Sequence, residues 1–139
     1  MVIQRWQTVF LLIAAIMMGI FCFSTVAEIH VGESVKGFRV ADAPVFLTVN
    51  VLIAALLVLS IFMYRNIRRQ MLMTLVVIVL VAASMVTGGF ILYGGMNGGG
   101  SVELLVSDLL LVGTAIFALL AYYRMRRDHK LLTSYDRLR

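Results

Sequence analysis

The chain has 139 residues, of which 62% are hydrophobic and only 14% are charged. A soluble domain has about half of its residues apolar and about a quarter charged, whereas the mean hydropathy here reaches +1.01. This composition excludes a soluble globular enzyme and a disordered chain. The single cysteine, Cys22, excludes an intrachain disulfide and so a disulfide-stabilised scaffold. The class that remains is a small integral membrane protein.

Four apolar segments are long enough to be transmembrane helices, since about 20 helical residues cross a hydrocarbon core of about 30 Å. The first is too long for a signal-peptide core and has a poor cleavage pattern, so we expect it to be retained. The sequence therefore predicts an all-α membrane protein, a single four-helix transmembrane domain over residues 1–139. The segments are residues 8–27, 45–64, 71–93 and 104–123, and Asp108 is the one charged residue within them.

The basic residues predict the orientation of the bundle. Ten of the 12 lysines and arginines lie near the chain ends or in the short segment 65–70, and only Lys36 and Arg39 lie on the other side. Because short cytoplasmic segments are rich in Lys and Arg, both termini are predicted to be cytoplasmic. The net charge of +5 is then an orientation signal, with no nucleic-acid footprint. Aromatic residues are expected to mark the two interfaces: Trp6, Tyr64, Tyr122 and Tyr123 inside, and Phe46, Phe90 and Tyr93 outside.

The connecting segments differ in character. In the outer loop, residues 29–31 and 38–40 alternate apolar and polar types around Gly32 and Gly37. A short β-hairpin and an irregular loop both remain open for this segment. Residues 94–100 contain five glycines, and we expect a flexible turn there.

The tail over residues 124–139 is basic, and it also predicts an amphipathic helix. Leu131, Leu132, Tyr135 and Leu138 are spaced along one helical side. Such a segment can lie on the anionic lipid head groups of the cytoplasmic leaflet, dock onto a partner protein, or serve only as a solvated topology anchor.

Both ends of the chain resemble a known family. Residues 2–8, Val-Ile-Gln-Arg-Trp-Gln-Thr, resemble the Ile-Gln-Arg-x-Gln-Thr start of a family of four-span Bacteroidota membrane proteins catalogued as domain of unknown function 4293. Residues 127–139, Arg-Asp-His-Lys-Leu-Leu-Thr-Ser-Tyr-Asp-Arg-Leu-Arg, resemble its Lys-Asp-Glu-Lys-Leu-Val-x-Ser-x-Asp-Arg-Leu-Arg end. The chain departs from the family at Trp6, where an aliphatic residue is usual, and at His129, where an acid is usual. The resemblance implies a multi-pass protein of the bacterial inner membrane, and it brings no activity, ligand or catalytic residue with it.

The two end motifs fall on the predicted cytoplasmic side, where acidic and basic residues interleave. Orientation alone would need only basic residues, so mixed signs favour specific pairing within the chain or with a partner. The candidate face for a partner or for lipid comprises Gln4, Arg5, Arg65, Arg68, Arg69, Arg127, Asp128, Lys130, Asp136, Arg137 and Arg139.

A second candidate site lies within the membrane. A carboxylate in a span costs about 3 kcal/mol at the bilayer centre, but Asp108 is near the span's end. If the helix begins near Ser101, Asp108 lies in its second turn, where the helix dipole favours a carboxylate. Polar residues at matching depth suggest one layer that either joins the helices or binds a proton, an ion or a lipid head group. This candidate cluster comprises Asn50, Ser84, Thr87, Ser107 and Asp108.

Three classes of function are open to a small membrane protein of this kind. A non-catalytic accessory or scaffold subunit of a membrane complex explains the small size and the mixed-charge tail. An oligomeric transporter or channel component would use the polar layer around Asp108. A membrane enzyme would have only Glu28, His30 and Glu33 of the outer loop as candidate groups. The sequence favours the first class, with no enzyme activity, metal or cofactor, and with the lipid bilayer, a partner protein or further copies of the chain as partners.

Overall fold

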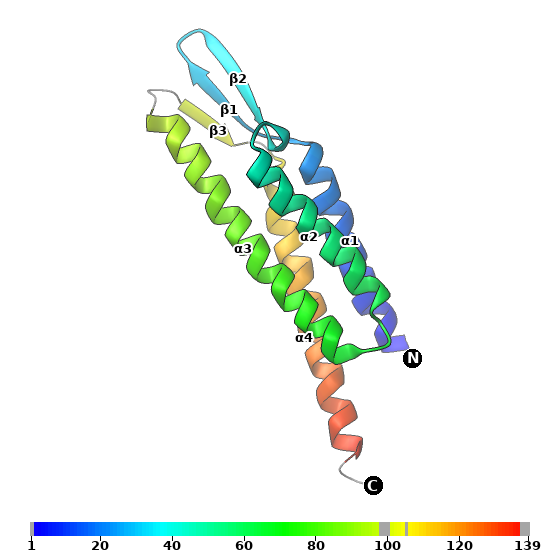
Figure 1. Ribbon diagram of the computed structural model, residues 1–139. Coiled ribbons are helices and arrows are strands. Elements are labelled where there is room, and N and C mark those ends of the chain that lie inside the picture. Colours follow the sequence, from blue (N-terminus) through cyan, green and yellow to red (C-terminus); the bar gives the residue numbers. More distant parts are fainter. Residues whose placement is uncertain (1, 98–100, 105, 137–139) are drawn as a thin grey trace.

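The computed structural model describes residues 2–97, 101–104 and 106–136, and it forms a bundle of long helices with a small sheet at one end (Figure 1). The helices are α1 (Val2–Phe23), α2 (Pro44–Phe62), α3 (Ile67–Asn97) and α4 (Asp108–Asp136). The strands are β1 (Thr25–Val31), β2 (Ser34–Arg39) and β3 (Ser101–Leu104), and a 3₁₀ turn, η1 (Val40–Asp42), precedes α2.

Successive helices run in opposite directions, so each end of the bundle has its own set of connections. Helix α1 packs against α2 and α4, and α3 packs against the same two helices. The N-terminus, the turn between α2 and α3 and the start of α3 lie at one end, where α4 also exits, and we call this the termini end (Figure 1). The strands lie at the opposite end, which we call the sheet end.

The core follows one spacing in all four helices. Buried positions alternate steps of four and three residues, the spacing that keeps one helical side facing a left-handed bundle. Alanines among them allow α1 and α4 to approach closely. The pattern runs through Gln7, Leu11, Ala14, Met18 and Phe21 of α1; Phe46, Asn50, Ile53, Leu57 and Ser60 of α2; Gln70, Thr74, Val77, Val81 and Ser84 of α3; and Leu111, Thr114, Ala118, Ala121 and Met125 of α4.

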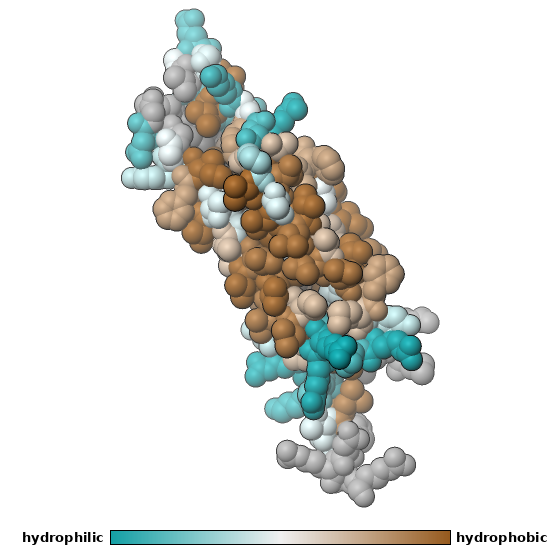
Figure 2. All heavy atoms as spheres, viewed as in Figure 1, coloured by the Kyte–Doolittle hydropathy of each residue, from teal (hydrophilic) through white to brown (hydrophobic). Residues whose placement is uncertain are grey.

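The outer surface of the bundle is also apolar. Figure 2 shows a broad hydrophobic band around the middle of the molecule, with hydrophilic residues gathered at its two ends. Within the described residues, four helices are long and apolar enough to cross a membrane, over Trp6–Phe23, Pro44–Phe62, Ile67–Gly94 and Asp108–Ser134. A bundle that is apolar both inside and outside is stable only in lipid, so the chain is a multi-pass membrane protein.

Residues 25–39 form the hairpin that the sequence left open. Strands β1 and β2 pair antiparallel, and the turn between them contains Gly32 at a φ of +63°. The sequence did not predict the third strand: β3 pairs with the other edge of β1 and gives the strand order β2-β1-β3. Glu28 of β1 thereby lies in register with both Gly37 of β2 and Glu103 of β3.

This sheet changes three expectations about the sheet end. The first helix ends at Phe23, because β1 begins at Thr25, and the fourth begins at Asp108, because residues 101–104 form β3 and pair with β1. Helix α3 continues through Asn97, so the prediction of a flexible turn is wrong for residues 94–97. Residues 98–100, the rest of that predicted turn, lie outside the described part. The fold accordingly contains the four apolar helices that the sequence predicted, together with a small sheet in which the hairpin was left open and the third strand was not expected.

Two further expectations change within the helices. Phe46 is no interfacial anchor, because it is 1% exposed and its ring meets Phe21 edge-on, with centroids 6.2 Å apart. The predicted tail is helical as far as Asp136, and this helix is the uninterrupted continuation of α4 and no separate element.

Candidate functional site

The predicted intramembrane cluster divides into separate groups, and its clearest contact joins α2 to α3. The hydroxyl of Ser84 donates a hydrogen bond of 2.7 Å to Oδ1 of Asn50. Nδ2 of Asn50 in turn donates to the carbonyl oxygen of Phe46 at 2.8 Å. Both polar side chains are fully buried. Because these bonds are satisfied within the bundle, this pair joins the helices and leaves Asn50 little capacity for a ligand.

Thr87 and Ser107 do not join this pair. Thr87 is exposed, and its hydroxyl donates to the carbonyl oxygen of Ala83, one turn earlier on the same helix. The hydroxyl of Ser107 donates to the carbonyl oxygen of Thr25, so it fastens the start of α4 to the start of β1. These two side chains therefore have local structural roles.

Asp108 is the first residue of α4, one turn nearer the helix start than the sequence suggested. It borders a pocket of about 180 Å³ at the sheet end, and Oδ2 of its carboxylate is buried without a hydrogen-bond partner among the described residues. Asp108 is the one charged side chain of the lining. The other lining residues are Phe21, Val26, Phe46, Met85, Gly88, Gly89, Leu92, Leu111 and Val112.

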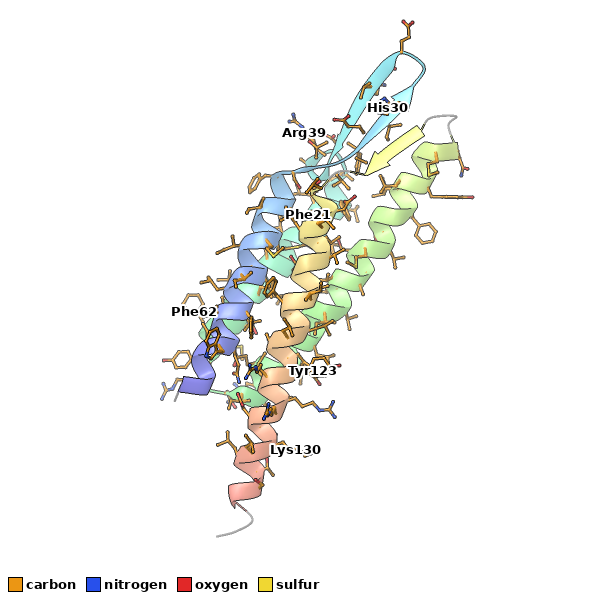
Figure 3. The ribbon with its side chains drawn as sticks, turned by 180° about the vertical axis from the view of Figure 1, so that it is seen from behind. Phe21, His30, Arg39, Phe62, Tyr123 and Lys130 are labelled. Atoms are coloured by element: carbon orange, nitrogen blue, oxygen red, sulfur yellow. The ribbon has the colours of Figure 1, made fainter. Side chains whose placement is uncertain are left out.

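The residues considered for enzyme chemistry lie on the hairpin. Glu28 and His30 are two residues apart on β1 and share one side of the sheet. Glu33 lies in the turn and is exposed. Figure 3 shows His30 on the hairpin, at the sheet end of the molecule. In the part of the chain that the structure describes, no three His, Cys, Asp or Glu side chains gather as a metal site would require.

At the termini end, two polar contacts attach α4 to its neighbours. Nε2 of Gln7 on α1 donates to Oδ2 of Asp128. Nε of Arg68 on α3 donates to Nε2 of His129 at 3.1 Å. Consecutive residues of α4 thus contact helices on two sides, with Gln7 only 2% exposed and the Arg68 contact open to solvent.

The other cations of this end whose side chains the structure describes face solvent. Arg65, Arg69, Arg127 and Lys130 are exposed. In Figure 3, Lys130 lies on α4 beyond Tyr123, on the far side of the bundle from Arg39. Arg137 and Arg139 lie outside the described residues, as do the side chains of Gln4, Arg5 and Asp136. The specific pairing that the mixed charges of the tail favour, within the chain or with a partner, therefore stays a prediction for these residues.

Sequence reasoning missed several polar contacts between helices. The hydroxyls of Ser60 on α2 and Thr74 on α3 lie 3.2 Å apart in the core near the termini end. Gln7 was considered only as part of a motif, and its contact with Asp128 was not foreseen. The alternating spacing of four and three residues would have identified Gln7, Ser60 and Thr74. Each of them lies on the same helical side as the buried apolar residues of its helix.

Together, the lipid-facing helices, the buried interhelical hydrogen bonds and the polar ends define a small multi-pass membrane protein with a bundle of four helices. The chain belongs to the family described as Domain of unknown function (DUF4293), which matches residues 3–138. The family resemblance of the two end motifs is thereby confirmed. No curated protein and no solved structure matches the chain.

Proposed function

We propose that this protein is a non-catalytic accessory or scaffold subunit of a complex in the bacterial inner membrane. In this proposal the four helices anchor the subunit, both termini are cytoplasmic, and the projecting end of α4 binds a partner protein. One observation carries the proposal. Helix α4 runs without interruption to Asp136, and its last turns extend beyond the other three helices (Figure 1).

The projecting part of α4 combines apolar and basic side chains. Leu131 and Leu132 are 46% and 53% exposed, and in the sequence they follow the charged segment 124–130. Exposed apolar side chains that are rimmed by polar residues are typical of a surface that contacts another protein. The exposed Arg127 and Lys130 beside them would give such a contact its charge specificity.

The direction of the helix favours a protein partner over a lipid surface. An amphipathic helix that binds a leaflet lies in the plane of the interface. The end of α4 instead continues along the direction of the bundle, beyond the other three helices (Figure 1). Arg65, Arg68 and Arg69 lie around the start of α3, and these residues suit the anionic head groups.

Purification in a gentle detergent tests the proposal, with partners identified and quantified by mass spectrometry. We expect a stoichiometric partner that is lost from the double variant Leu131→Ala, Leu132→Ala. The matched control is Leu119→Ala, Leu120→Ala, which removes two adjacent exposed leucines from the membrane-spanning part of the same helix. Recovery of the chain alone, or equal loss of the partner from both double variants, would contradict the proposal. Recovery of further copies of the same chain alone would support the oligomeric transporter or channel component.

A further inference from the structure

The pocket beside Asp108 opens toward lipid. Its lining includes Gly89, which is exposed on α3, and Val112, which is 42% exposed on α4. Gly89 also borders a shallow recess on the outer face of α3, formed with Val86, Phe90 and Tyr93. Because these side chains belong to helices that cross the membrane, a molecule dissolved in the bilayer can reach the pocket from the side.

The pocket has a polar rim and an apolar interior. Asp108 begins α4, and Leu111 and Val112 follow one turn further into the bundle, about 5–6 Å deeper at the helical rise. The paired rings of Phe21 and Phe46 form the inner wall. A ligand that matches this order has one polar group at the level of Asp108 and a hydrocarbon segment directly attached to it.

The carboxylate of Asp108 lacks a hydrogen-bond donor among the described residues, and this determines the chemistry of the polar group of the ligand. The group must carry a positive charge and donate a hydrogen bond. A buried carboxylate oxygen without a donor is unfavourable. None of the lining residues is basic. The residues at the sheet end include five acids, Glu28, Glu33, Asp42, Glu103 and Asp108, against only Lys36 and Arg39. This end therefore attracts cations, and a primary ammonium would supply both the positive charge and an N–H donor.

We propose that the pocket binds a membrane amphiphile in which a primary ammonium is joined directly to a hydrocarbon chain. The ammonium donates to Oδ2 of Asp108, and the first carbons of the chain fill the apolar interior. A phosphate next to the amine would bring a second, negative charge toward Asp108 without a basic residue to meet it. At about 180 Å³ the pocket is smaller than the ~300–1,000 Å³ of sites that enclose a whole ligand. The rest of the chain lies in the recess along Val86, Phe90 and Tyr93.

Photolabelling of the purified protein in lipid nanodiscs tests this inference. The probe is a dodecylamine with a diazirine in its chain, competed by unlabelled dodecylamine, dodecanol, dodecanoate or dodecyltrimethylammonium. We expect labelled peptides from the pocket walls, around Met85–Leu92 and Leu111–Val112. Only dodecylamine should compete, because the alcohol lacks the charge, the carboxylate is repelled and the quaternary ammonium has no N–H donor.

Two variants and a control separate binding from folding. Asp108→Asn, which keeps the shape but loses the charge, should reduce specific labelling about tenfold, as expected for loss of a charged hydrogen bond. Gly89→Leu should block the entrance, since a Cβ there meets nothing within 4 Å and the side chain can occupy the open space. The control Gly19→Leu makes the same change at an equally open glycine of α1 and should label like the unchanged protein. Competition by dodecanol, or equal labelling of the Asp108→Asn variant, would overturn the inference.

Discussion

Ser84 on α3 donates a 2.7 Å hydrogen bond to Asn50 on α2, and neither side chain is exposed. In lipid no water competes for these groups, yet the unfolded chain also finds partners, and measured couplings of this kind average about 0.6 kcal/mol and reach about 1.7 kcal/mol. We expect the Asn50→Ala, Ser84→Ala double-mutant cycle to give a coupling of about 1 kcal/mol in the free energy of unfolding, measured in bicelles by steric trapping. Thr87→Ala is the control, since Thr87 bonds only its own helix, and a coupling of zero between Asn50 and Ser84 would contradict the prediction.

The contact between Gln7 and Asp128 gives a second prediction, which depends on the burial of its donor. Gln7 is 2% exposed, so Asp128→Ala leaves a buried amide without its acceptor and should cost about 1–3 kcal/mol of unfolding free energy. Adding Gln7→Leu removes the stranded amide and should restore most of that stability. Lys130→Ala, a change of an exposed residue on the same helix, should matter little. A double variant no more stable than Asp128→Ala would show that the amide needs no partner.

Helices α1 and α4 are close where Met17 packs over Gly113. A Cβ placed at Gly113 would collide with the terminal methyl group of Met17. Since that group is the end of a flexible side chain, Gly113→Ala should be tolerated, whereas Gly113→Leu should overpack the contact and cost about 1–3 kcal/mol. Combining Gly113→Leu with Met17→Ala should recover part of the loss in the same unfolding assay. Gly19→Leu, at a glycine with open space around it, is the control, and an equal loss there would contradict the steric explanation.

The sequence predicts the features of this molecule that depend on neighbouring residues, and it misses those that depend on contacts between residues far apart in the chain. The spans follow from apolar runs of about the bilayer thickness, a local property that needs no knowledge of neighbours. The ends of the spans near Phe23 and Asp108 were misplaced because Ala27 and Leu104, 77 positions apart, pair as strands, and only the folded chain brings them together. The same holds for the site. Asp108 stands out in the sequence by its charge, but the apolar pocket beside it is built from residues of every helix and of β1.

The hairpin turn depends on the left-handed backbone of Gly32, whose φ is +63°. A residue with a Cβ is strained there, by about 1–2 kcal/mol for a β-branched side chain, whereas asparagine adopts this region more easily. We expect Gly32→Val to increase amide hydrogen exchange throughout β1 and β2, and Gly32→Asn to change it much less. The helices should keep their protection in both variants. Indistinguishable exchange in the two variants would show that the turn can adopt another conformation.

The proposed orientation gives the last prediction, which labelling of single cysteines can test. Cys22 is buried at 5% exposure, and Cys22→Ala provides a background without thiols, since it is the chain's one cysteine. Lys36 on β2 and Lys130 on α4 are both exposed and lie at opposite ends of the bundle, so each can be replaced by cysteine without disturbing the core. With the termini in the cytoplasm, a membrane-impermeant maleimide added to spheroplasts should label Lys36→Cys at once and Lys130→Cys only after lysis. The physical reason is that ten of the 12 basic residues lie near the chain ends or in the segment 65–70 of the sequence, and cationic segments resist translocation across the inner membrane. Labelling of Lys130→Cys alone in intact spheroplasts would reverse the orientation and move the projecting end of α4 to the outer side, away from any cytoplasmic partner.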